Sequence, residues 1–462
     1  MAASPRVGRF LEWLGGRGAS FANVGVGPSA RHGGYGVFAT AAISKGEEVL
    51  RIPHSALMTA PAAREVPAVR DALVRAREKR VNDNGGNLGL ALWVLEEREK
   101  ADASEWAPYL DMLPQNLGHL PAFWNADDLK CLDGTPLRAA ADDRRLAYAA
   151  DADAVGRDAE SFSWADASVS SRAFAVTLHG REATRAMVPL ADLLNTARHH
   201  ERHVDFFDIE GCFVMKARRD VPASEELTDS YGAKANASLL LNYGVAFDRN
   251  VDADGASLDS CAVDVALVKE DARKRLRWVD GADGDAAVLR ANCSAQPPCA
   301  ELRFALALCR LRCADAAELD ALDRRHFSWD AADFGDGRRR PHLAARQKLI
   351  ALATAPSLSR GHEANAYAAL ETIIAAQLGQ IGDAAPATAQ ANANAAAAQA
   401  YVDGQRSALG NVGAFAADMR RVLHGSTAET TTTAVLDREL AAVEPSWVDA
   451  SRPRTLDAGR AS

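Results

Sequence analysis

Short apolar runs punctuated by glycine occupy residues 21–59. Two of them, Gly36–Ala39 and Glu48–Pro53, are rich in residues that strands favour, and the proline ends the second run. Over residues 62–165 the apolar positions recur at helical spacing instead, most clearly from Leu88 to Leu95. The pattern therefore predicts a compact β unit followed by a set of helices.

The β pattern returns over residues 188–247. Val204–Phe207 and Cys212–Met215 are separated by a turn that contains Glu210 and Gly211, so the two runs can pair as a hairpin. A hairpin at this point folds the residues before it toward the residues after it. The pattern thus predicts that the two flanking segments lie close together.

Beyond Asn250 the pattern is helical. Glu301–Cys313 is largely apolar and follows two prolines, as expected of a helix buried along a broad face. Residues 409–423 and 435–443 have the pattern of closing helices. Residues 383–400 are low in complexity and rich in Ala, Asn and Gln. Alanine favours a helix there but buries little surface, so a helix and a mobile linker both remain open.

Composition limits the class of protein. A chain of 462 residues exceeds one ordinary core, so two or three domains are expected, and 48% hydrophobic with 25% charged residues is typical of a soluble globular protein. The net charge of −9 argues against general binding to nucleic acid, which depends on clustered Lys and Arg. No stretch reaches the roughly 20 apolar residues of a membrane span.

The cysteines and the first residues bear on the compartment. The seven cysteines are odd in number and scattered, which suits a reducing compartment better than a disulfide scaffold. The segment from Met1 to Arg6 has no apolar leader core. We expect a monomer in the cytosol or nucleus, with a protein partner; a plastid location is less expected.

Two short segments carry the candidate chemistry. Met187–Thr196 is an apolar run that ends in two hydrogen-bonding side chains, Asp192 and Asn195. Glu225–Gly232 places Tyr231 beside a glycine directly after an acidic turn. The predicted hairpin lies between the two segments, so we expect them to form one site.

Together with the glycine segment Gly34–Ala39, these segments resemble the SET-domain protein methyltransferases. In that family the glycine segment and an Asn-His pair hold S-adenosyl-L-methionine, and the Tyr of the Tyr-Gly pair lies at the methyl-transfer centre. Ser104–Leu110, Leu132–Thr135 and Ser171–Phe174 follow the order seen in one branch, typified by the Rubisco large-subunit lysine methyltransferases and the actin-histidine methyltransferases.

The resemblance implies an α+β protein. It implies a β-rich SET fold over residues 13–250, split by a helical insertion at about 62–165. An all-α substrate-binding-like domain would follow over residues 251–445, before a tail at 446–462.

Residue by residue, the resemblance also implies a site. The catalytic residue is Tyr231, and the substrate channel is lined by Phe174, Ala191 and Tyr243. The residues implied to contact S-adenosyl-L-methionine are Gly33, Gly34, Tyr35, Arg172, Asp192, Leu193, Leu194, Asn195, Thr196, Tyr243, Gly244 and Val245.

The chemistry of these residue types agrees with such a role. Methyl transfer from a sulfonium to an amine is an in-line displacement that requires alignment and desolvation and no covalent intermediate. A phenol at Tyr231 can orient toward the methyl group and the attacking nitrogen. Arg172 can bind a carboxylate through its fork, and Asn195 offers a donor and an acceptor. Gly34 and Gly36 allow the backbone to approach a ligand closely.

Four positions depart from the family pattern. Thr196 replaces the His of the Asn-His pair, and Gly33 replaces an acidic residue. Val245 replaces an aromatic residue, and Ser224 replaces a glycine before the Glu-Glu-Leu run. These changes bear on turnover and product state more than on the fold.

Lysine is the expected acceptor. The histidine-directed branch uses a Trp and an Asn where this chain has Ala191 and Phe174, so an imidazole would lose its planar partner and leave a ring nitrogen unpaired. A lysine stem suits an apolar channel past Phe174 and Tyr243. A histidine methyltransferase of the same architecture and a non-catalytic SET-like module that binds a protein are the alternatives.

A metal site is the competing interpretation of one charged segment. His199, His200 and His203, with Glu201 and Asp205, have spacings that could ligate a divalent ion on a helix. Because the segment is rich in charge and follows the proposed cofactor loop, we expect a solvated loop and no metal.

Overall fold

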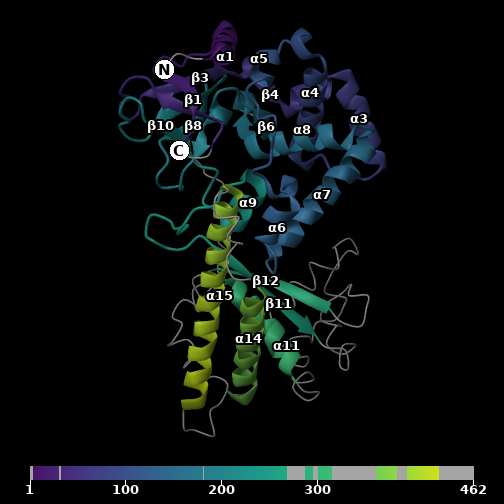
Figure 1. Ribbon diagram of the computed structural model, residues 1–462, viewed down its shortest axis with the longest axis vertical. Coiled ribbons are helices and arrows are strands. Elements are labelled where there is room, and N and C mark those ends of the chain that lie inside the picture. The colour runs from purple at the N-terminus through teal and green to yellow at the C-terminus, as the bar shows by residue number, and fades with distance from the viewer. Residues whose placement is uncertain are drawn as a thin grey trace. The chain divides into compact units, whose positions relative to one another are not determined.

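The structure is a computed structural model that describes residues 4–30, 33–180, 182–267, 287–294, 300–314, 360–381 and 393–425. The chain divides into two compact units (Figure 1). One consists of Met1–Gly255 with Ala384–Tyr401, and the other of Ala256–Asp383 with Val402–Ser462.

The first sheet of the first unit brings distant parts of the chain together. β1 (Val24–Pro28) pairs antiparallel with β2 (Tyr35–Ala39), and β10 (Glu226–Asp229) pairs antiparallel with the other edge of β2. The sheet is completed by β7 (Asn195–Thr196), which runs parallel to β10. Both polar segments singled out in the sequence are therefore strands of one sheet.

A second sheet contains the predicted hairpin. β8 (Val204–Ile209) and β9 (Cys212–Ala217) pair antiparallel across Glu210 and Gly211, whose φ angles of 53° and 73° suit a tight turn. β3 (Glu48–Pro53) pairs with the other edge of β9. The hairpin and the strand at 48–53 are confirmed.

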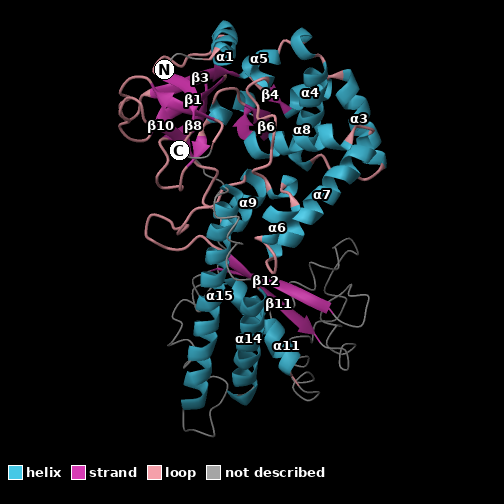
Figure 2. Cartoon of the chain, in the orientation of Figure 1, coloured by secondary structure: helices cyan, strands magenta, loops and turns pink. Residues whose placement is uncertain are grey.

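A third sheet, in the order β4-β6-β5, borders the helical insertion (Figure 2). Its strands are β4 (Met58–Thr59), β5 (Phe174–Thr177) and β6 (Ala183–Met187). The insertion between β4 and β5 is confirmed; its helices are α2 (Ala60–Glu65), α3 (Pro67–Glu78), α4 (Asn87–Glu99), α5 (Ala107–Leu110), α6 (Ala126–Lys130), α7 (Pro136–Val155) and α8 (Ala159–Arg172). The last of them ends on Arg172, one of the expected cofactor residues.

Two more helices flank the sheets of this unit. α1 (Pro5–Gly16), which the sequence analysis did not predict, is capped by the Ser4 hydroxyl, which accepts from the Val7 N–H at 3.3 Å. α9 (Asn236–Tyr243) ends at Gly244, whose φ of 71° is the left-handed conformation typical of a helix C-cap.

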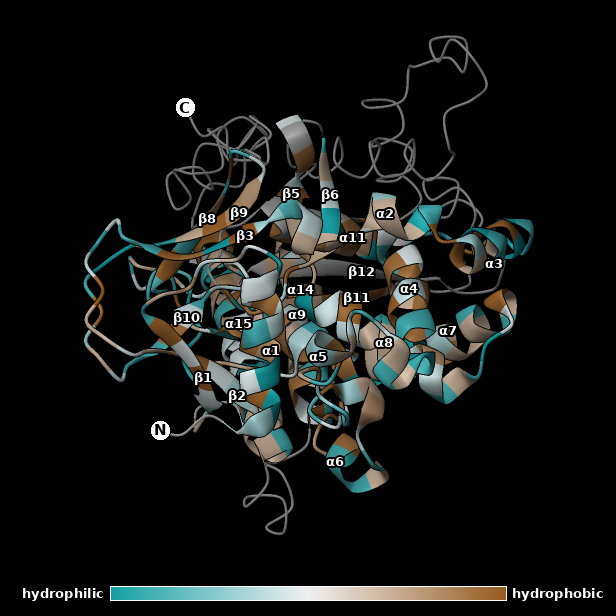
Figure 3. Cartoon of the chain, turned by 90° about the horizontal axis from the view of Figure 1, so that it is seen from above, coloured by the Kyte–Doolittle hydropathy of each residue, from teal (hydrophilic) through white to brown (hydrophobic). Residues whose placement is uncertain are grey.

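One contiguous hydrophobic core joins the sheets, α1 and the insertion helices. α4 is apolar on nearly all sides and is buried over most of its length. Figure 3, which is coloured by hydropathy, shows hydrophobic residues along β8 and β9 and again in α4. The insertion thus packs as part of the same core that supports the sheets.

The second unit begins with two strands that the sequence analysis took for helix. β11 (Ser260–Leu267) and β12 (Ala287–Ser294) pair antiparallel from Ser260 opposite Ser294 to Leu267 opposite Ala287. Within β11, Val263 and Val265 are fully buried on either side of the half-buried Asp264, which is the period of a strand. The C-terminal region is helical as expected, but the expectation that it is helical throughout requires this correction.

The helices of the C-terminal region are α11 (Ala300–Cys313), α14 (Arg360–Gln380) and α15 (Ala393–Gly425). The predicted helices at 301–313 and 409–423 are confirmed, and of the low-complexity segment residues 393–400 are helical. Residues 383–392, the predicted helix at 435–443 and the tail at 446–462 lie outside the described residues. No helix that the structure describes has the length and apolar character needed to span a membrane.

A buried ion pair links α11 to α14. Arg310 Nε lies 2.7 Å from Glu363 Oε1, and the two side chains are 7% and 0% exposed. The neighbouring His362 donates from Nε2 to the Arg310 carbonyl oxygen at 3.0 Å. These two opposite charges of the second unit are therefore buried together.

Candidate functional site

Tyr231 and the Asn195 segment meet where β7 pairs with β10. Asn195 lies opposite Thr228, and Thr196 opposite Asp229. Just beyond β10, the backbone N–H of Tyr231 donates to Thr196 Oγ1 at 3.1 Å. The side chain of Thr196, which replaces the family's histidine, therefore fixes the backbone of the candidate catalytic tyrosine.

The ring of Tyr231 stacks on that of Tyr243. Their centroids are 4.5 Å apart, with an interplanar angle of 29°, and the Tyr231 hydroxyl donates to the Leu194 carbonyl oxygen at 3.3 Å. The amine of Lys234 donates to the Tyr231 carbonyl oxygen and lies 5.4 Å from the Tyr243 centroid. Burial raises the pKa of the Tyr231 phenol to about 12. The phenol therefore stays protonated at neutral pH and acts as a hydrogen-bond donor.

Asn195 ties this region to the glycine segment. Its Nδ2 donates to the Tyr35 carbonyl oxygen at 3.2 Å and to Glu226 Oε1 at 2.7 Å. The other Glu226 oxygen accepts from the Ser29 hydroxyl at 3.1 Å. The sequence pattern does not single out Glu226, because this residue looks like one member of an ordinary acidic turn.

The glycines of the upstream segment have two different uses. Gly33 and Gly34 have φ angles of 72° and 66°, and a Cβ added to either would meet nothing within 4 Å. A Cβ on Gly36 would lie 2.5 Å from Glu226 Oε1. The open backbone at Gly34 is compatible with close approach of a ligand, whereas Gly36 makes room for the Glu226 and Asn195 side chains.

The half-buried Arg172 lies beside the buried Asp192. Arg172 Nη1 donates to the backbone carbonyl of Asp192 at 2.6 Å, and Tyr109 donates its hydroxyl to Asp192 Oδ2 at 2.5 Å. Burial raises the pKa of the Asp192 carboxyl to about 6, although Arg172 and the Tyr109 bond both oppose this rise. Arg172 Nε and Asp192 Oδ1 are buried and have no hydrogen-bond partner in the part of the chain that the structure describes.

The backbone that carries Asp192 is strained. It lies in the short 3-10 helix η6 (Ala191–Leu193), which follows Leu190, a non-glycine residue with a φ of 74°. The side chains of Ala191, Leu193 and Leu194 are buried in the core. Only the backbone groups of Leu193 and Leu194 are therefore suited to contact a ligand.

His119 is a member of the site that the sequence did not reveal. A Cβ on Gly244 would lie 2.5 Å from the His119 carbonyl oxygen and 2.6 Å from its Cδ2. Burial lowers the pKa of His119 to about 4, and the charge of Arg172 lowers it further. His119 is thus neutral at neutral pH, and Gly244 cannot carry a side chain. Val245 beside it is half-buried.

Phe174, one of the expected channel residues, makes different ring contacts from the two tyrosines. Among the ring contacts of the described residues, those of Phe174 are with Phe206 and Phe213, at centroid distances of 5.4 and 5.2 Å. Those of Tyr231 are with Tyr243. The place of Phe174 and Ala191 in a substrate channel stays a prediction.

Two of the three histidines weighed as metal ligands, His199 and His203, are engaged in hydrogen bonds. His203 is buried, with Nδ1 2.7 Å from Thr228 Oγ1 and Nε2 2.8 Å from Glu225 Oε1. His199 Nδ1 lies 3.3 Å from the Ser230 hydroxyl. In the part of the chain that the structure describes, no group of three or more His, Cys, Asp or Glu residues is placed to hold a metal ion.

Comparisons with known proteins agree with this arrangement. The family model of the SET domain matches residues 34–232. The human N-lysine methyltransferase SETD6 is 26% identical over 246 residues, which cover 48% of this chain and 50% of that protein. The rat SETD6 is 29% identical, covering 60% and 63%, and the ribosomal lysine N-methyltransferase 4 of Saccharomyces cerevisiae is 26% identical, covering 49% and 51%. The chain thus spans roughly half the length of the curated relatives it matches.

Solved structures resemble the chain over nearly its whole length. The SET domain of LSMT bound to lysine and AdoHcy has a TM-score of 0.65 at 18% identity and covers 92% of this chain and 94% of its own. Rubisco LSMT bound to AdoMet has a TM-score of 0.65 at 17% identity and covers 94% and 100%. Residues 34–232 thus match the family model of the SET domain, and the fold of the chain resembles that of the LSMT structures.

Proposed function

We propose that this protein is an S-adenosyl-L-methionine-dependent protein N-methyltransferase that acts on lysine. The observation that carries the proposal is the convergence of the Asn195 segment on Tyr231, with the Tyr231 ring stacked on Tyr243. The curated relatives named N-lysine methyltransferases support it.

The residues around Arg172 fit the amino-acid end of such a donor. That end is a zwitterion, with one carboxylate and one ammonium group. Among the described residues, Arg172 Nε is a buried donor without a hydrogen-bond partner, and Asp192 Oδ1 is a buried acceptor without one. Unpaired buried atoms of opposite sign are costly unless a ligand satisfies them, so Arg172 would hold the carboxylate and Asp192 the ammonium group.

The rest of the donor site is assigned by position. The backbone around Gly33, Gly34 and Tyr35 would approach the donor, and Asn195 holds that backbone in place through the Tyr35 carbonyl. The bound donor supplies an electrophilic methyl group on a sulfonium. The stacked tyrosines supply apolar walls and one oriented hydroxyl.

Tyr231 orients the reacting groups and does not remove the proton from the lysine amine. With its pKa raised to about 12, the phenol is a poor proton acceptor at neutral pH. An incoming lysine must therefore lose its proton by another route, and desolvation beside the stacked rings lowers its pKa from the ordinary value of about 10.4. Alignment of a neutral amine with the methyl group is then the main contribution of the protein.

Lysine is favoured over histidine by the residues that are present. Ala191 offers no planar surface for an imidazole, and Phe174 offers no acceptor for a ring nitrogen. The stacked pair of Tyr231 and Tyr243 suits an aliphatic stem with a polar end.

The test is to incubate the purified chain with host lysate and isotopically labelled donor, and to map the labelled proteins by mass spectrometry. Labelled methyl-lysine supports the proposal. N-methylhistidine as the only product would overturn the lysine assignment. No label in any protein, from a chain that binds the donor, would favour the non-catalytic module.

A further inference from the structure

The strongest candidate outside the assigned residues is Tyr109, which lies on α5 in the helical insertion. Its side chain is fully buried, and its hydroxyl donates to Asp192 Oδ2 across 83 positions of sequence at 2.5 Å. Burial, together with the charge of Asp192, raises the pKa of the Tyr109 phenol well above its usual value. The proton therefore stays on the Tyr109 oxygen, and the Asp192 carboxylate accepts the hydrogen bond.

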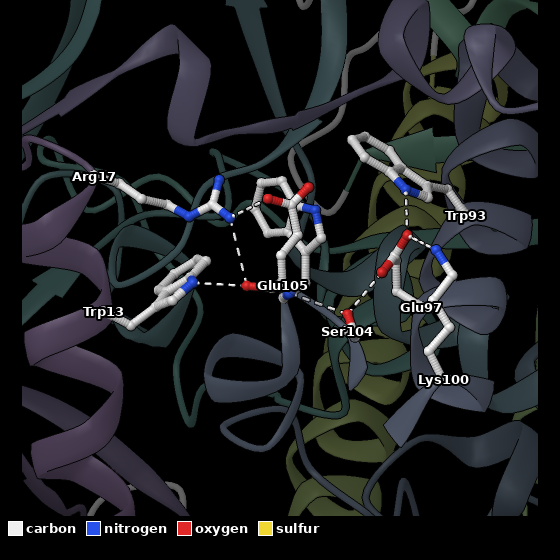
Figure 4. Close-up of polar contacts among 8 residues, drawn as sticks. Trp13, Arg17, Trp93, Glu97, Lys100, Ser104 and Glu105 are labelled. Atoms are coloured by element: carbon white, nitrogen blue, oxygen red, sulfur yellow. Dashed lines mark hydrogen bonds and ion pairs between the residues drawn. The ribbon is translucent and has the colours of Figure 1, made fainter. Parts of the chain in front are cut away.

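The Tyr109 ring is held in place by aromatic residues of α1 and by Trp106. It stacks on Trp13 at a centroid distance of 6.3 Å and an interplanar angle of 5°, and it also contacts Phe10 and Trp106. Trp13 is itself fixed, because its indole N–H donates to the Glu105 carbonyl oxygen at 2.7 Å (Figure 4). The hydroxyl of Tyr109 is thus aimed by a rigid cluster.

The chain from α1 to Asp192 is completed by Arg17. Its guanidinium lies 4.7 Å from the Trp13 ring centroid and 4.6 Å from that of Trp106, and it donates to Glu105 Oε2 at 2.8 Å (Figure 4). A cation between two indoles adds to the stability of the cluster. Every member of this chain of contacts belongs to the first unit.

We propose that Tyr109 is a positioning residue of the donor site, which acts by orienting the Asp192 carboxylate so that Oδ1 faces the ammonium group of the donor. One lone-pair site of the carboxylate is taken by Tyr109, and the backbone of Asp192 is anchored by Arg172. The free oxygen is then the only part of Asp192 left to bind a ligand. This inference rests on the proposed function.

The inference predicts a pH signature. Asp192 has a pKa of about 6, so the donor loses a charged partner as the pH falls through that value. The groups that face Asp192 are Tyr109 from α5 and Arg172 from α8. The charges of Asp192 and Asp229 both act on Tyr231, and Asp229 also has a pKa raised by burial to about 6. Only Asp192, however, is bonded to Tyr109.

The experiment is a calorimetric titration with S-adenosylhomocysteine over a pH range that brackets this value. Tyr109→Phe should weaken binding at neutral pH by roughly threefold to thirtyfold. As the pH is lowered, the affinity of Tyr109→Phe should also begin to fall at a higher pH than that of the wild type. The reason is that the lost hydrogen bond had stabilised the Asp192 carboxylate. In an Asp192→Asn background, Tyr109→Phe should produce no further shift of the pH profile.

Two further variants keep the test sharp. Tyr148→Phe removes a hydroxyl from another buried tyrosine, on α7, and should leave the profile unchanged. If Tyr109→Phe does not fold, 3-fluorotyrosine at position 109 keeps the hydroxyl and makes it a stronger donor, so the fall in affinity should move to lower pH.

The outcomes are distinguishable. Wild-type affinity and an unshifted pH profile in folded Tyr109→Phe, or no shift with fluorotyrosine, would assign Tyr109 to packing and leave the proposed function intact. If the wild type binds neither S-adenosylhomocysteine nor S-adenosyl-L-methionine, the proposed function fails and this inference fails with it.

Discussion

The two units bury charge in different ways. In the second unit, the Arg310 guanidinium and the Glu363 carboxylate form a direct ion pair at 2.7 Å. In the first, the Arg172 guanidinium donates to the backbone carbonyl of Asp192 and not to its carboxylate. A direct ion pair balances its two charges without a ligand, whereas a guanidinium and a carboxylate that do not meet can each bind a ligand group of opposite charge.

The backbone also differs between the two pairs, because Arg310 and Glu363 lie in the helices α11 and α14. Asp192 follows Leu190, which adopts a φ of 74° and lies in the core. Such strain persists where the surrounding structure enforces it, and it is common at ligand sites. We therefore expect the pair at Arg310 to serve stability and Arg172 and Asp192 to serve binding of the proposed donor.

The largest effect is expected from breaking the ion pair of Arg310 and Glu363. Glu363→Ala leaves Arg310 buried without its carboxylate, which costs about 3–5 kcal/mol. Hydrogen exchange read peptide by peptide should show protection lost in α11 and α14, with donor affinity unchanged. Asp418→Ala, at a pair whose side chains are 77% and 62% exposed, is the control and should leave exchange unaltered. Wild-type protection in Glu363→Ala would remove the distinction between the two pairs.

The next largest effect is expected on the rate of methyl transfer alone. Tyr231→Phe keeps the ring stacked on Tyr243 and removes the hydroxyl that points to Leu194, so transfer should slow by roughly ten- to a thousandfold. Donor affinity and melting temperature should stay near those of the wild type. Single-turnover rates on the mapped substrate measure this. A fully active Tyr231→Phe would show that the hydroxyl has no part in transfer.

A smaller effect is expected on donor binding. Asn195→Ala removes the bonds to Tyr35 and Glu226, which costs about 1–3 kcal/mol, or roughly tenfold to a hundredfold in affinity. Asn23→Ala, which removes a 2.9 Å bond to Glu47 on another part of the first unit, should bind the donor normally. Equal affinity in both variants would assign Asn195 to packing.

Locally encoded elements could be predicted from the sequence. The hairpin at 204–217 and the helix at 300–313 follow from turn residues and periodicity that lie within a few positions of each other. β11 could not be separated from a helix in the same way, because its partner strand begins only at Ala287. Pairing with a distant strand decided its conformation.

The residues of the candidate site also divide into those that the sequence predicts and those that it does not. Asn195 and Tyr231 lie in recognisable segments, and the structure brings them together. The bond from Tyr109 to Asp192 joins residues 83 positions apart, and nothing near either residue predicts it. Ser224, noted as a departure from a glycine, has a φ of 70°, which explains why glycine suits that position.

The most direct test of the account is whether the wild-type chain binds the donor at neutral pH. Titration with S-adenosyl-L-methionine and with S-adenosylhomocysteine, followed by calorimetry and by melting temperature, should show one saturable site, and Tyr231→Phe should bind equally well. A folded wild-type chain that gives neither heat nor a rise in melting temperature with either ligand would contradict the assignment of Arg172 and Asp192 as a donor site.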